Sequence, residues 1–285
     1  MKLFRFGPVG DEKPGVRTDD GALFDVSAFG EDYGEAFFGS DGPGRLRAWF
    51  ASNGKGCPRV SGGERIASAV TRPSKLVCVG LNFRGHAAET GAQLPTEPVL
   101  FMKASTALAG PNDALTLPRG SRATDWEVEF ALVIGKRARY VSKADAPKHI
   151  AGYVLHNDYS ERDHQKERGG QWVKGKSADG FAPLGPWLVL PDAVNPFDTE
   201  LWLSVNGEEM QRSSTSDLIF DVPTLVSYIS EFMTLLPGDV ISTGTPAGVG
   251  MGKTPPRYLR PGDVVEYGAT GLGSAKHQVI AAELA

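Results

Sequence analysis

The ten residues from Asp125 to Ile134 constrain the fold more than any other part of this 285-residue chain. Side chains alternate along this segment as they do along a β-strand, in which successive side chains point to opposite faces. One face is therefore expected to carry the apolar side chains Trp126, Val128, Phe130, Leu132 and Ile134. The other face begins with two glutamates and continues with small apolar residues, so we expect both faces of this strand to be buried.

The two glutamates, Glu127 and Glu129, would lie side by side at one end of the strand. Two buried carboxylates repel each other unless a cation neutralises them or one of them is protonated. An ion that prefers oxygen ligands, such as Mg²⁺, meets that need. The alternative is a solvent-exposed strand face, on which a Glu-x-Glu pattern is common.

A third carboxylate, Asp158, follows the apolar residues 153–155 at the expected end of another strand. Its side chain can complete a metal site there, or it can act as a helix N-cap or turn residue. Arg162 and Gln165 lie four and seven residues beyond Asp158, on one face if the segment is helical. This pair can bind a carboxylate and a carbonyl of a substrate, or it can belong to a surface helix of mixed charge.

His86 and Glu89 follow another expected strand and are neighbours if the segment forms a helical turn. A carboxylate beside an imidazole fixes its tautomer and raises its basicity, so such a pair can deprotonate water. Gly85 and Gly91 weaken the helix, as in a segment that becomes ordered over a substrate. The alternative is an incidental pair on the protein surface.

Two glycine-containing segments carry lysines. Lys174 or Lys176 can supply a fixed positive charge to a pocket, although the residue types alone favour two surface lysines. The segment Ala247–Thr254 matches a loose form of the phosphate-binding loop. That loop requires a helix to begin at its Lys-Thr pair, and the two prolines at 255–256 prevent this. We therefore reject nucleotide binding.

The expected elements describe a strand-rich protein with few helices. Strands are predicted at residues 3–6, 23–26, 76–80, 127–134, 150–157, 186–190 and 201–205, and helices at 45–51 and 221–232. Two Pro-Gly-Asp-Val segments, at 237–240 and 261–264, each predict a turn before a strand. The polar, glycine-containing segment 52–63 precedes a change in texture, so we expect a small N-terminal domain at residues 1–72 and a catalytic domain at 73–285.

Composition argues against two classes of protein. A formal net charge of −4 leaves no basic surplus for bulk nucleic-acid binding. No run approaches the roughly 18 apolar residues that a membrane helix needs, and the first residues do not resemble a signal peptide. Cys57 and Cys78 lack metal-type spacing, and so few cysteines favour a reduced, cytoplasmic location.

In their order and spacing these segments resemble the fumarylacetoacetate hydrolase superfamily over residues 75–279. The motifs that carry the resemblance are Gly80–Phe83 with His86 and Glu89, Pro98–Lys103, Glu127–Glu129, Asn157–Asp163, Lys176–Ser177 and Ile241–Gly250. The resemblance implies a mostly β catalytic fold of mixed sheets with some α-helix, a small N-terminal α+β domain and a homodimer. One departure is Glu161, where family members usually have alanine before an Arg-Asp pair.

The resemblance also implies a role for each candidate residue. The three carboxylates Glu127, Glu129 and Asp158 would hold a divalent ion, usually Mg²⁺, with Mn²⁺ or Ca²⁺ as alternatives. His86 and Glu89 would form a water-activating dyad on a lid, and Lys176 would stabilise an oxyanion. The residues implied to contact the substrate are Lys103, Arg162, Gln165 and Thr245.

The implied activity is metal-dependent hydrolysis of a C–C bond in a 2,4-diketo acid, giving pyruvate and a second acid. Chain length and the N-terminal extension are similar to the branch that acts on 2,4-diketo-3-deoxy sugar acids, such as the L-rhamnonate and L-fuconate derivatives, with lactate as the second product. Acylpyruvates and fumarylpyruvate are alternative substrates. Oxaloacetate-type decarboxylation and dienoate isomerisation are alternative reactions, and a non-catalytic metal- or ligand-binding module is a third possibility.

Overall fold

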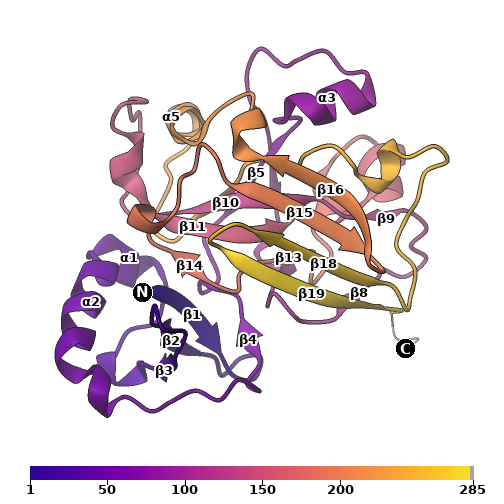
Figure 1. The fold of residues 1–285 in the computed structure, drawn as a ribbon. Coiled ribbons are helices and arrows are strands. Elements are labelled where there is room, and N and C mark those ends of the chain that lie inside the picture. The colour runs from indigo at the N-terminus through magenta and orange to yellow at the C-terminus, as the bar shows by residue number, and fades with distance from the viewer. Residues whose placement is uncertain (283–285) are drawn as a thin grey trace.

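A computed structural model of the protein describes residues 1–282. Within these residues two large β-sheets form the centre of the molecule, with helices and loops around them (Figure 1). The ten-stranded sheet contains, in spatial order, β3 (Leu23–Asp25), β2 (Lys13–Arg17), β1 (Lys2–Phe6), β14 (Leu188–Val189), β11 (Ile150–Asn157), β10 (Val128–Ile134), β17 (Val240–Ser242), β5 (Leu76–Gly80) and β6 (Val99–Lys103), with β4 (Ile66–Ala67) paired to β1.

The second large sheet has five strands among the described residues, and two short sheets complete the β-structure. In spatial order the five strands are β16 (Glu208–Ser214), β15 (Glu200–Val205), β18 (Val264–Ala269), β19 (Gly273–Ile280) and β8 (Leu115–Thr116). The short sheets pair β12 (Ser160–Glu161) with β9 (Thr124–Asp125) and β13 (Ala182–Pro183) with β7 (Leu108–Ala109). The α-helices are α1 (Glu35–Gly39), α2 (Gly42–Asn53), α3 (Arg84–Thr90), α4 (Val173–Lys176) and α5 (Val222–Phe232).

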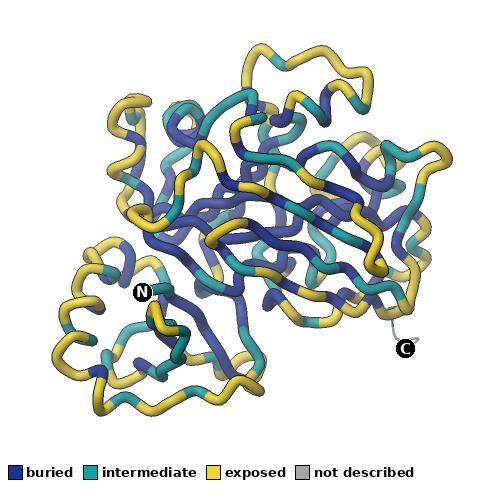
Figure 2. Tube along the Cα trace, in the orientation of Figure 1, coloured by how far each residue is buried: buried dark blue, intermediate teal, exposed yellow. Residues whose placement is uncertain are grey.

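Strands β10 and β11 form the buried centre of the ten-stranded sheet. They run antiparallel, with Glu129 opposite His156, and every residue of both strands is buried (Figure 2). Strands β15 and β18 of the five-stranded sheet pack against β10, so water reaches neither of its faces. This double coverage explains why β10 is apolar beyond its two glutamates, and it confirms the expectation that both faces are buried.

Most of the predicted elements agree with the structure to within a few residues. The predicted helix at 221–232 is α5, which begins after the N-cap Asp221, whose carboxylate accepts the Thr224 amide proton at 3.0 Å. The predicted strand at 186–190 shrinks to β14, because Pro186 and Pro191 flank it and cannot donate to a sheet. Both Pro-Gly turns lead directly into strands, β17 and β18.

The N-terminal residues gather in one corner of the molecule, where β1 to β3 lie beside α1 and α2 (Figure 1). Strand β1 nevertheless pairs with β14, with Lys2 opposite Val189, so the ten-stranded sheet runs from this corner into the rest of the chain. The domain boundary after residue 72 stays a prediction. Among residues 1–282, no helix combines the length and the apolar character needed to cross a membrane.

Candidate active site

A cavity of about 270 Å³ lies beside the first residues of β10. It is lined by seven of the ten residues singled out from the sequence: His86, Glu127, Glu129, Arg162, Gln165, Lys176 and Thr245. Two of the other three contact lining residues, Glu89 through His86 and Asp158 through Lys176, and Lys103 lies one step further back, in contact with Asp158. The fold therefore brings all ten residues to one place.

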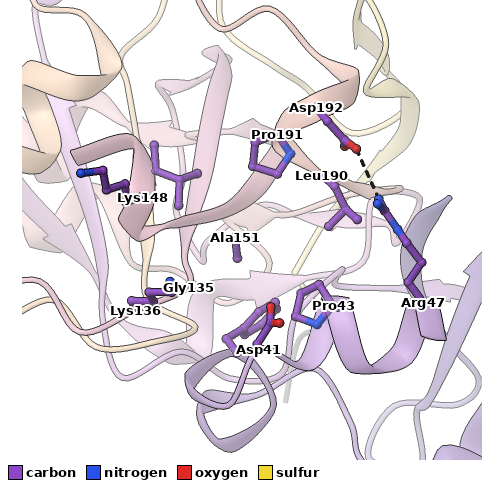
Figure 3. Close-up of a pocket in the computed structure, with 13 residues that line it drawn as sticks. Asp41, Pro43, Arg47, Gly135, Lys136, Lys148, Ala151, Leu190, Pro191 and Asp192 are labelled. Carbon is purple, nitrogen blue, oxygen red and sulfur yellow. Dashed lines mark hydrogen bonds and ion pairs between the residues drawn. The ribbon is translucent and has the colours of Figure 1, made fainter. Parts of the chain in front are cut away.

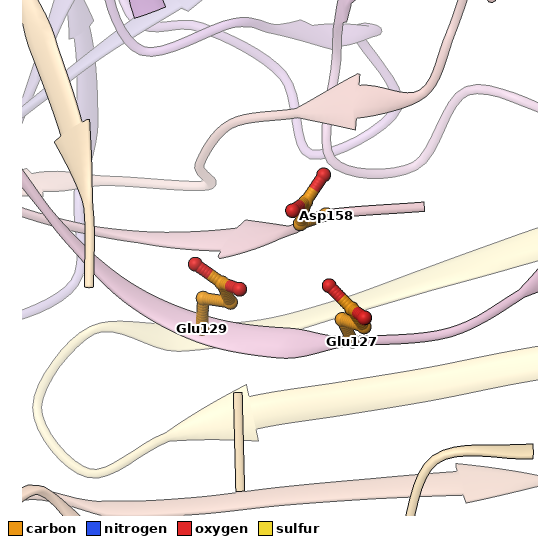
Figure 4. Close-up of side chains that lie close together, drawn as sticks. All are labelled: Glu127, Glu129 and Asp158. Atoms are coloured by element: carbon orange, nitrogen blue, oxygen red, sulfur yellow. The ribbon is translucent and has the colours of Figure 1, made fainter. Parts of the chain in front are cut away.

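Three carboxylates converge at this cavity (Figure 4). Glu127 lies one residue before β10, Glu129 lies within β10, and Asp158 follows β11. One oxygen of each lies within 4.8 Å of the others, and all three side chains are buried. The strand alternation predicted for the two glutamates is thus confirmed, and the alternative of a solvent-exposed strand face is excluded.

Two of these carboxylates are paired with buried cations. Lys176 Nζ donates to Glu127 Oε2 at 2.6 Å and to Asp158 Oδ2 at 2.7 Å, and Lys103 Nζ donates to Asp158 Oδ1. Arg162 Nη2 donates to Glu127 Oε1 at 2.7 Å. Burial alone would raise the pKa of Asp158, but the two ammonium groups hold it well below its usual range.

Glu129 has no cation of its own. Its Oε2 accepts the hydroxyl proton of Ser242 and the amide proton of Gly244, at 2.5 and 2.9 Å, and among residues 1–282 no donor reaches its Oε1. Burial first, and then the nearby charges of Asp158 and Glu127, raise the pKa of Glu129 well above its usual value.

The donor set fits a divalent cation. Among the described residues, the four buried carboxylates Asp125, Glu127, Glu129 and Asp158 lie beside three buried cationic side chains, those of Lys103, Arg162 and Lys176, which form ion pairs with all of them except Glu129. The excess negative charge lies on Glu129, whose Oε1 is available as a ligand, and hard cations such as Mg²⁺ or Mn²⁺ prefer such oxygens.

Lys176 reaches the carboxylates because α4 packs closely against its surroundings. A Cβ atom on Gly175 would lie 2.5 Å from the carbonyl oxygen of Glu161 and 2.6 Å from Cβ of Gln165, so only glycine permits this approach. Lys174 is exposed. Residue types alone had favoured two surface lysines. In the structure the two lysines differ, because Lys176 forms ion pairs with the buried carboxylates of Glu127 and Asp158.

Arg162 and Gln165 are placed by a sharp change of backbone direction. Strand β12 ends at Glu161, and a π-helical turn at Asp163–Glu167 follows at once. Arg162 Nη1 donates to Gln165 Oε1 at 3.0 Å, so the two side chains act as a connected pair at the cavity wall. The predicted helical proximity is therefore correct, although the turn is wider than an α-helix.

Glu161, the departure from the usual alanine, does not line the cavity. Its buried carboxylate accepts from the Ala123 amide at 2.9 Å and the Thr124 hydroxyl at 2.6 Å, and also from the Ser121 hydroxyl. These bonds fasten β12 to the segment that leads into β9. The substitution therefore supports the backbone beneath Arg162 and leaves the polarity of the cavity unchanged.

The predicted pair of His86 and Glu89 lies on helix α3. His86 Nδ1 and Glu89 Oε2 are 3.2 Å apart, and the other carboxylate oxygen accepts the Gly248 amide proton at 2.9 Å. Burial alone would raise the pKa of Glu89, but these two hydrogen bonds outweigh it and lower the pKa below its usual value. The helix is also tied to Asp217, which accepts the Gly85 amide proton. Glu89 is thus ionised and fixed beside the imidazole.

Two predicted substrate contacts differ in detail from the expectation. Lys103 is buried and does not line the cavity; its ammonium group contacts Asp158 and the carbonyl oxygen of Tyr159. Thr245 does line it, but its hydroxyl proton is donated to the carbonyl oxygen of Val128 at 3.0 Å while its oxygen accepts from Gln211 at 2.8 Å. Thr245 can therefore accept one further hydrogen bond but has none to donate.

Sequence reasoning missed two side chains that support the site. Ser242 links Glu129 to His156, whose Nδ1 lies 2.7 Å from the serine oxygen. Asp125 is fully buried and contacts Arg162. Asp125 is the first residue of the segment Asp125–Ile134. An acidic side chain at the start of a strand with two buried faces needs hydrogen-bonding or charged partners, and this was the signal that could have identified it.

A second cavity of about 280 Å³ lies between the N-terminal helices and the far ends of β10 and β11 (Figure 3). Its wall combines Pro43, Ala151 and Leu190 with charged residues at the rim, where Arg47 and Asp192 form an ion pair. None of the ten predicted site residues lines it. Of these two cavities, the one beside the carboxylates is therefore the candidate active site, because it joins ionisable groups of opposite charge to an imidazole and the other does not.

Comparison with known proteins agrees with this geometry. The chain is 46% identical over 284 residues to a 2,4-didehydro-3-deoxy-L-rhamnonate hydrolase of a Sphingomonas species, with 98% of this chain and 96% of that protein covered. Its structure is similar to a fumarylacetoacetate hydrolase from Exiguobacterium antarcticum, with a TM-score of 0.85, 36% identity and coverage of 99% and 100%. It is also similar to a maleylpyruvate hydrolase from a Sphingobium species in complex with manganese and pyruvate, with a TM-score of 0.82, 28% identity and coverage of 99% and 100%.

Residues 75–280 match the family described as fumarylacetoacetate hydrolase C-terminal. That range holds the cavity, the three carboxylates and the His86–Glu89 pair, and it begins one residue before β5. The match spans well over half of the 285 residues. With the motifs, the fold and the sequence identity all in agreement, this chain belongs to the fumarylacetoacetate hydrolase family of enzymes.

Proposed function

We propose that the protein hydrolyses a C–C bond of a 2,4-diketo-3-deoxy sugar acid, yielding pyruvate and lactate. The proposal rests on one observation. The His86–Glu89 pair and the carboxylate cluster lie beside the same cavity. A base that can activate water thus stands across from a site that can bind a 2-oxo acid. Decarboxylation needs no base of this kind, whereas isomerisation could use the imidazole to move a proton on carbon, so the products distinguish isomerisation from the water attack that the pair favours.

Glu127, Glu129 and Asp158 would hold the divalent ion, for which Mg²⁺ is our choice. When bound, the ion supplies a positive charge that polarises the 2-oxo group of the substrate. The cations of the protein pair with two of these carboxylates and hold them in place before any ion binds. Lys103 belongs to this supporting set, because its partner is Asp158.

His86 is the proposed general base. Glu89 accepts a hydrogen bond from Nδ1–H, which leaves Nε2 as the nitrogen that can take a proton from water. The resulting hydroxide attacks the C4 carbonyl carbon of the substrate. The C3–C4 bond then breaks, C3 receives a proton, and C4 leaves as the carboxylate of the second product. General-base help of this kind contributes about 10²–10⁴-fold to the rate.

Lys176 is positioned to stabilise the oxyanion that forms at C4. An ammonium group has three N–H donors, and two of them go to Glu127 and Asp158. The third is available at the cavity wall, and one such donor contributes about 3–4 kcal/mol to transition-state stability. Gln165 accepts from Arg162 through its oxygen and so keeps its amide N–H groups for the substrate.

The choice of a sugar acid rests on the relative from Sphingomonas, whose name specifies a didehydro-deoxy-rhamnonate, and on one feature of this cavity. Thr245 can only accept a further hydrogen bond, which suits a substrate hydroxyl. A sugar acid carries such a hydroxyl beyond C4, whereas a plain acylpyruvate does not.

The direct test is product formation by metal-stripped protein with and without added Mg²⁺. We expect Mg²⁺-dependent pyruvate and lactate from 2,4-diketo-3-deoxy-L-rhamnonate and a lower kcat/KM for acetylpyruvate. Pyruvate from acetylpyruvate alone would move the assignment to the acylpyruvase branch. Release of CO₂, or a shifted double bond without cleavage, would replace hydrolysis by decarboxylation or isomerisation.

Replacing the base isolates the dyad. His86→Ala should lower kcat by about 10²–10⁴-fold while Mg²⁺ affinity, measured by calorimetry, stays unchanged, because His86 is not among the carboxylate ligands. The matched control is His149→Ala, since His149 is a histidine outside the cavity. A His86→Ala variant with a near-normal rate would show that the dyad is assigned wrongly.

A further inference from the structure

Asp125 is the most heavily bonded carboxylate at the cavity, and no catalytic role accounts for it. Oδ1 accepts the amide protons of Trp126 and Gly250, at 2.8 and 2.7 Å. Oδ2 accepts the Met251 amide proton at 3.0 Å and the Nε proton of Arg162 at 2.9 Å, and Nη2 of Arg162 forms an ion pair with it at 2.8 Å. Five nitrogen atoms, four of them hydrogen-bond donors to the carboxylate, thus surround one fully buried side chain.

The bonds of Arg162 show what this arrangement achieves. A guanidinium group has five N–H donors in a fixed plane. Nε donates to Asp125, Nη2 donates to Glu127 and forms an ion pair with Asp125, and Nη1 donates to Gln165. One of the two N–H groups of Nη1 therefore has no partner among the described residues. Because the Arg162 side chain lines the cavity, this N–H is available to a ligand there.

The same loop that binds Asp125 also binds the dyad. The amides of Gly250 and Met251 donate to Asp125, and the amide of Gly248 donates to Glu89 at 2.9 Å. A Cβ atom on Gly250 would lie 2.7 Å from Asp125 Oδ1 and 2.0 Å from the carbonyl oxygen of Arg257, so only glycine fits there. This loop is the segment that resembles a phosphate-binding loop; its amides bind carboxylates of the protein.

We propose that Asp125 is a positioning residue for the reaction. It fixes the guanidinium plane of Arg162 against the Gly248–Met251 loop, and the one remaining N–H of Nη1 then binds the carboxylate of the acid substrate. The proposal rests on the proposed function in requiring an anionic substrate. Only an acceptor-only side chain of this size can serve, because an asparagine amide would direct N–H groups against at least two of the four donors.

The test is a double-mutant cycle of Asp125→Asn and Arg162→Gln, assayed with the diketo acid and Mg²⁺. We expect Asp125→Asn to raise KM by about 10- to 100-fold, with a smaller loss in kcat. In the Arg162→Gln background the same substitution should change kcat/KM by less than about 3-fold, because the residue through which Asp125 acts is gone. Losses that multiply fully across the cycle would overturn the proposal.

A matched control separates positioning from general stability. Asp239 is also fully buried and accepts from Ser74, Lys75 and the Leu236 amide, yet it lies outside the cavity. Asp239→Asn should lower Tm without raising KM. If Asp125→Asn fails to fold, Arg162→Lys replaces it, since lysine keeps the charge but lacks the planar fork. A near-normal KM for Arg162→Lys would then contradict the proposal.

A binding experiment with oxalate tests the positioning role of Asp125 separately from the proposed function. Oxalate presents a carboxylate beside a second oxygen donor, as a 2-oxo acid does, and needs no turnover. Calorimetry with Mn²⁺ present should give at least 10-fold weaker oxalate binding to Asp125→Asn than to the wild type. If the protein cleaves no diketo acid but shows this loss, the proposed function fails and the positioning role stands. Equal oxalate affinities would overturn the positioning role whatever the activity.

Discussion

At the scale of single residues, the site holds one carboxylate that the protein does not neutralise. Glu129 is buried beside Glu127 and Asp158, and among residues 1–282 it accepts hydrogen bonds from one hydroxyl and one amide and from no cationic side chain. Like charges in a buried place are unfavourable without a counter-ion. Glu127 is the opposite case, because Arg162 and Lys176 both pair with it. Glutamates two residues apart therefore differ in what they contribute to stability.

Removing each charge should have opposite effects on the metal-stripped protein. Glu129→Gln relieves repulsion, so its Tm should equal or exceed that of the wild type, and added Mg²⁺ should no longer raise it. Glu127→Gln leaves two buried cations short of a partner and should cost about 3–5 kcal/mol. Thermal unfolding with EDTA and with Mg²⁺ measures both effects. Equal shifts for the two variants would refute this account of the charges.

At the scale of elements, local patterns predicted the strands, helix α5 and the Pro-Gly turns, since these depend on neighbouring residues. What could not be predicted depends on partners far away in the sequence. The glycine-rich loop was identified and nucleotide binding rejected, but its carboxylate partners, Asp125 and Glu89, precede it by more than a hundred residues. The choice between Lys174 and Lys176 likewise depends on Glu127. Proximity of this kind arises only from the fold.

The loop geometry itself can be tested at Gly248. Its φ is 104°, and a Cβ atom there would lie 1.8 Å from the carbonyl oxygen of Met210, so Gly248→Ala must displace the loop. The amide bond to Glu89 should then be lost and kcat should fall at least about 10-fold. Gly262→Ala is the matched control, with φ of 99° but no atom within 4 Å of the added carbon. It should cost about 1 kcal/mol of stability and leave kcat unchanged. A normal kcat for Gly248→Ala would argue against the loop's role.

At the scale of the whole molecule, the strand patterns along the chain and the family resemblance predicted the β-rich class, but they did not predict the order of strands in the sheets. Strand β17 lies between β10 and β5, and β1 joins β14, so neighbours in space are distant in sequence. The five-stranded sheet closes over β10 and also buries a histidine of its own, His277 in β19. Its imidazole lies 3.0 Å from the Tyr267 hydroxyl and stacks on that ring. Burial lowers the pKa of His277 to about 4.

This lowered pKa makes the second sheet sensitive to acid. In the unfolded chain a histidine has a pKa of about 6.5, so the unfolded state binds more protons than the folded state between pH 6.5 and about 4. The free energy of unfolding therefore decreases as the pH is lowered through this range. From pH 7 to pH 5 the loss due to His277 should be about 2 kcal/mol. The measurement is urea unfolding at pH 7 and pH 5. The difference in the free energy of unfolding between these pH values should be smaller for His277→Gln than for the wild type by that amount. The control is His149→Gln, a histidine that lines neither cavity, and it should keep the wild-type difference. Parallel pH profiles for the wild type and His277→Gln would mean that the pKa of this imidazole is the same in the folded and unfolded states.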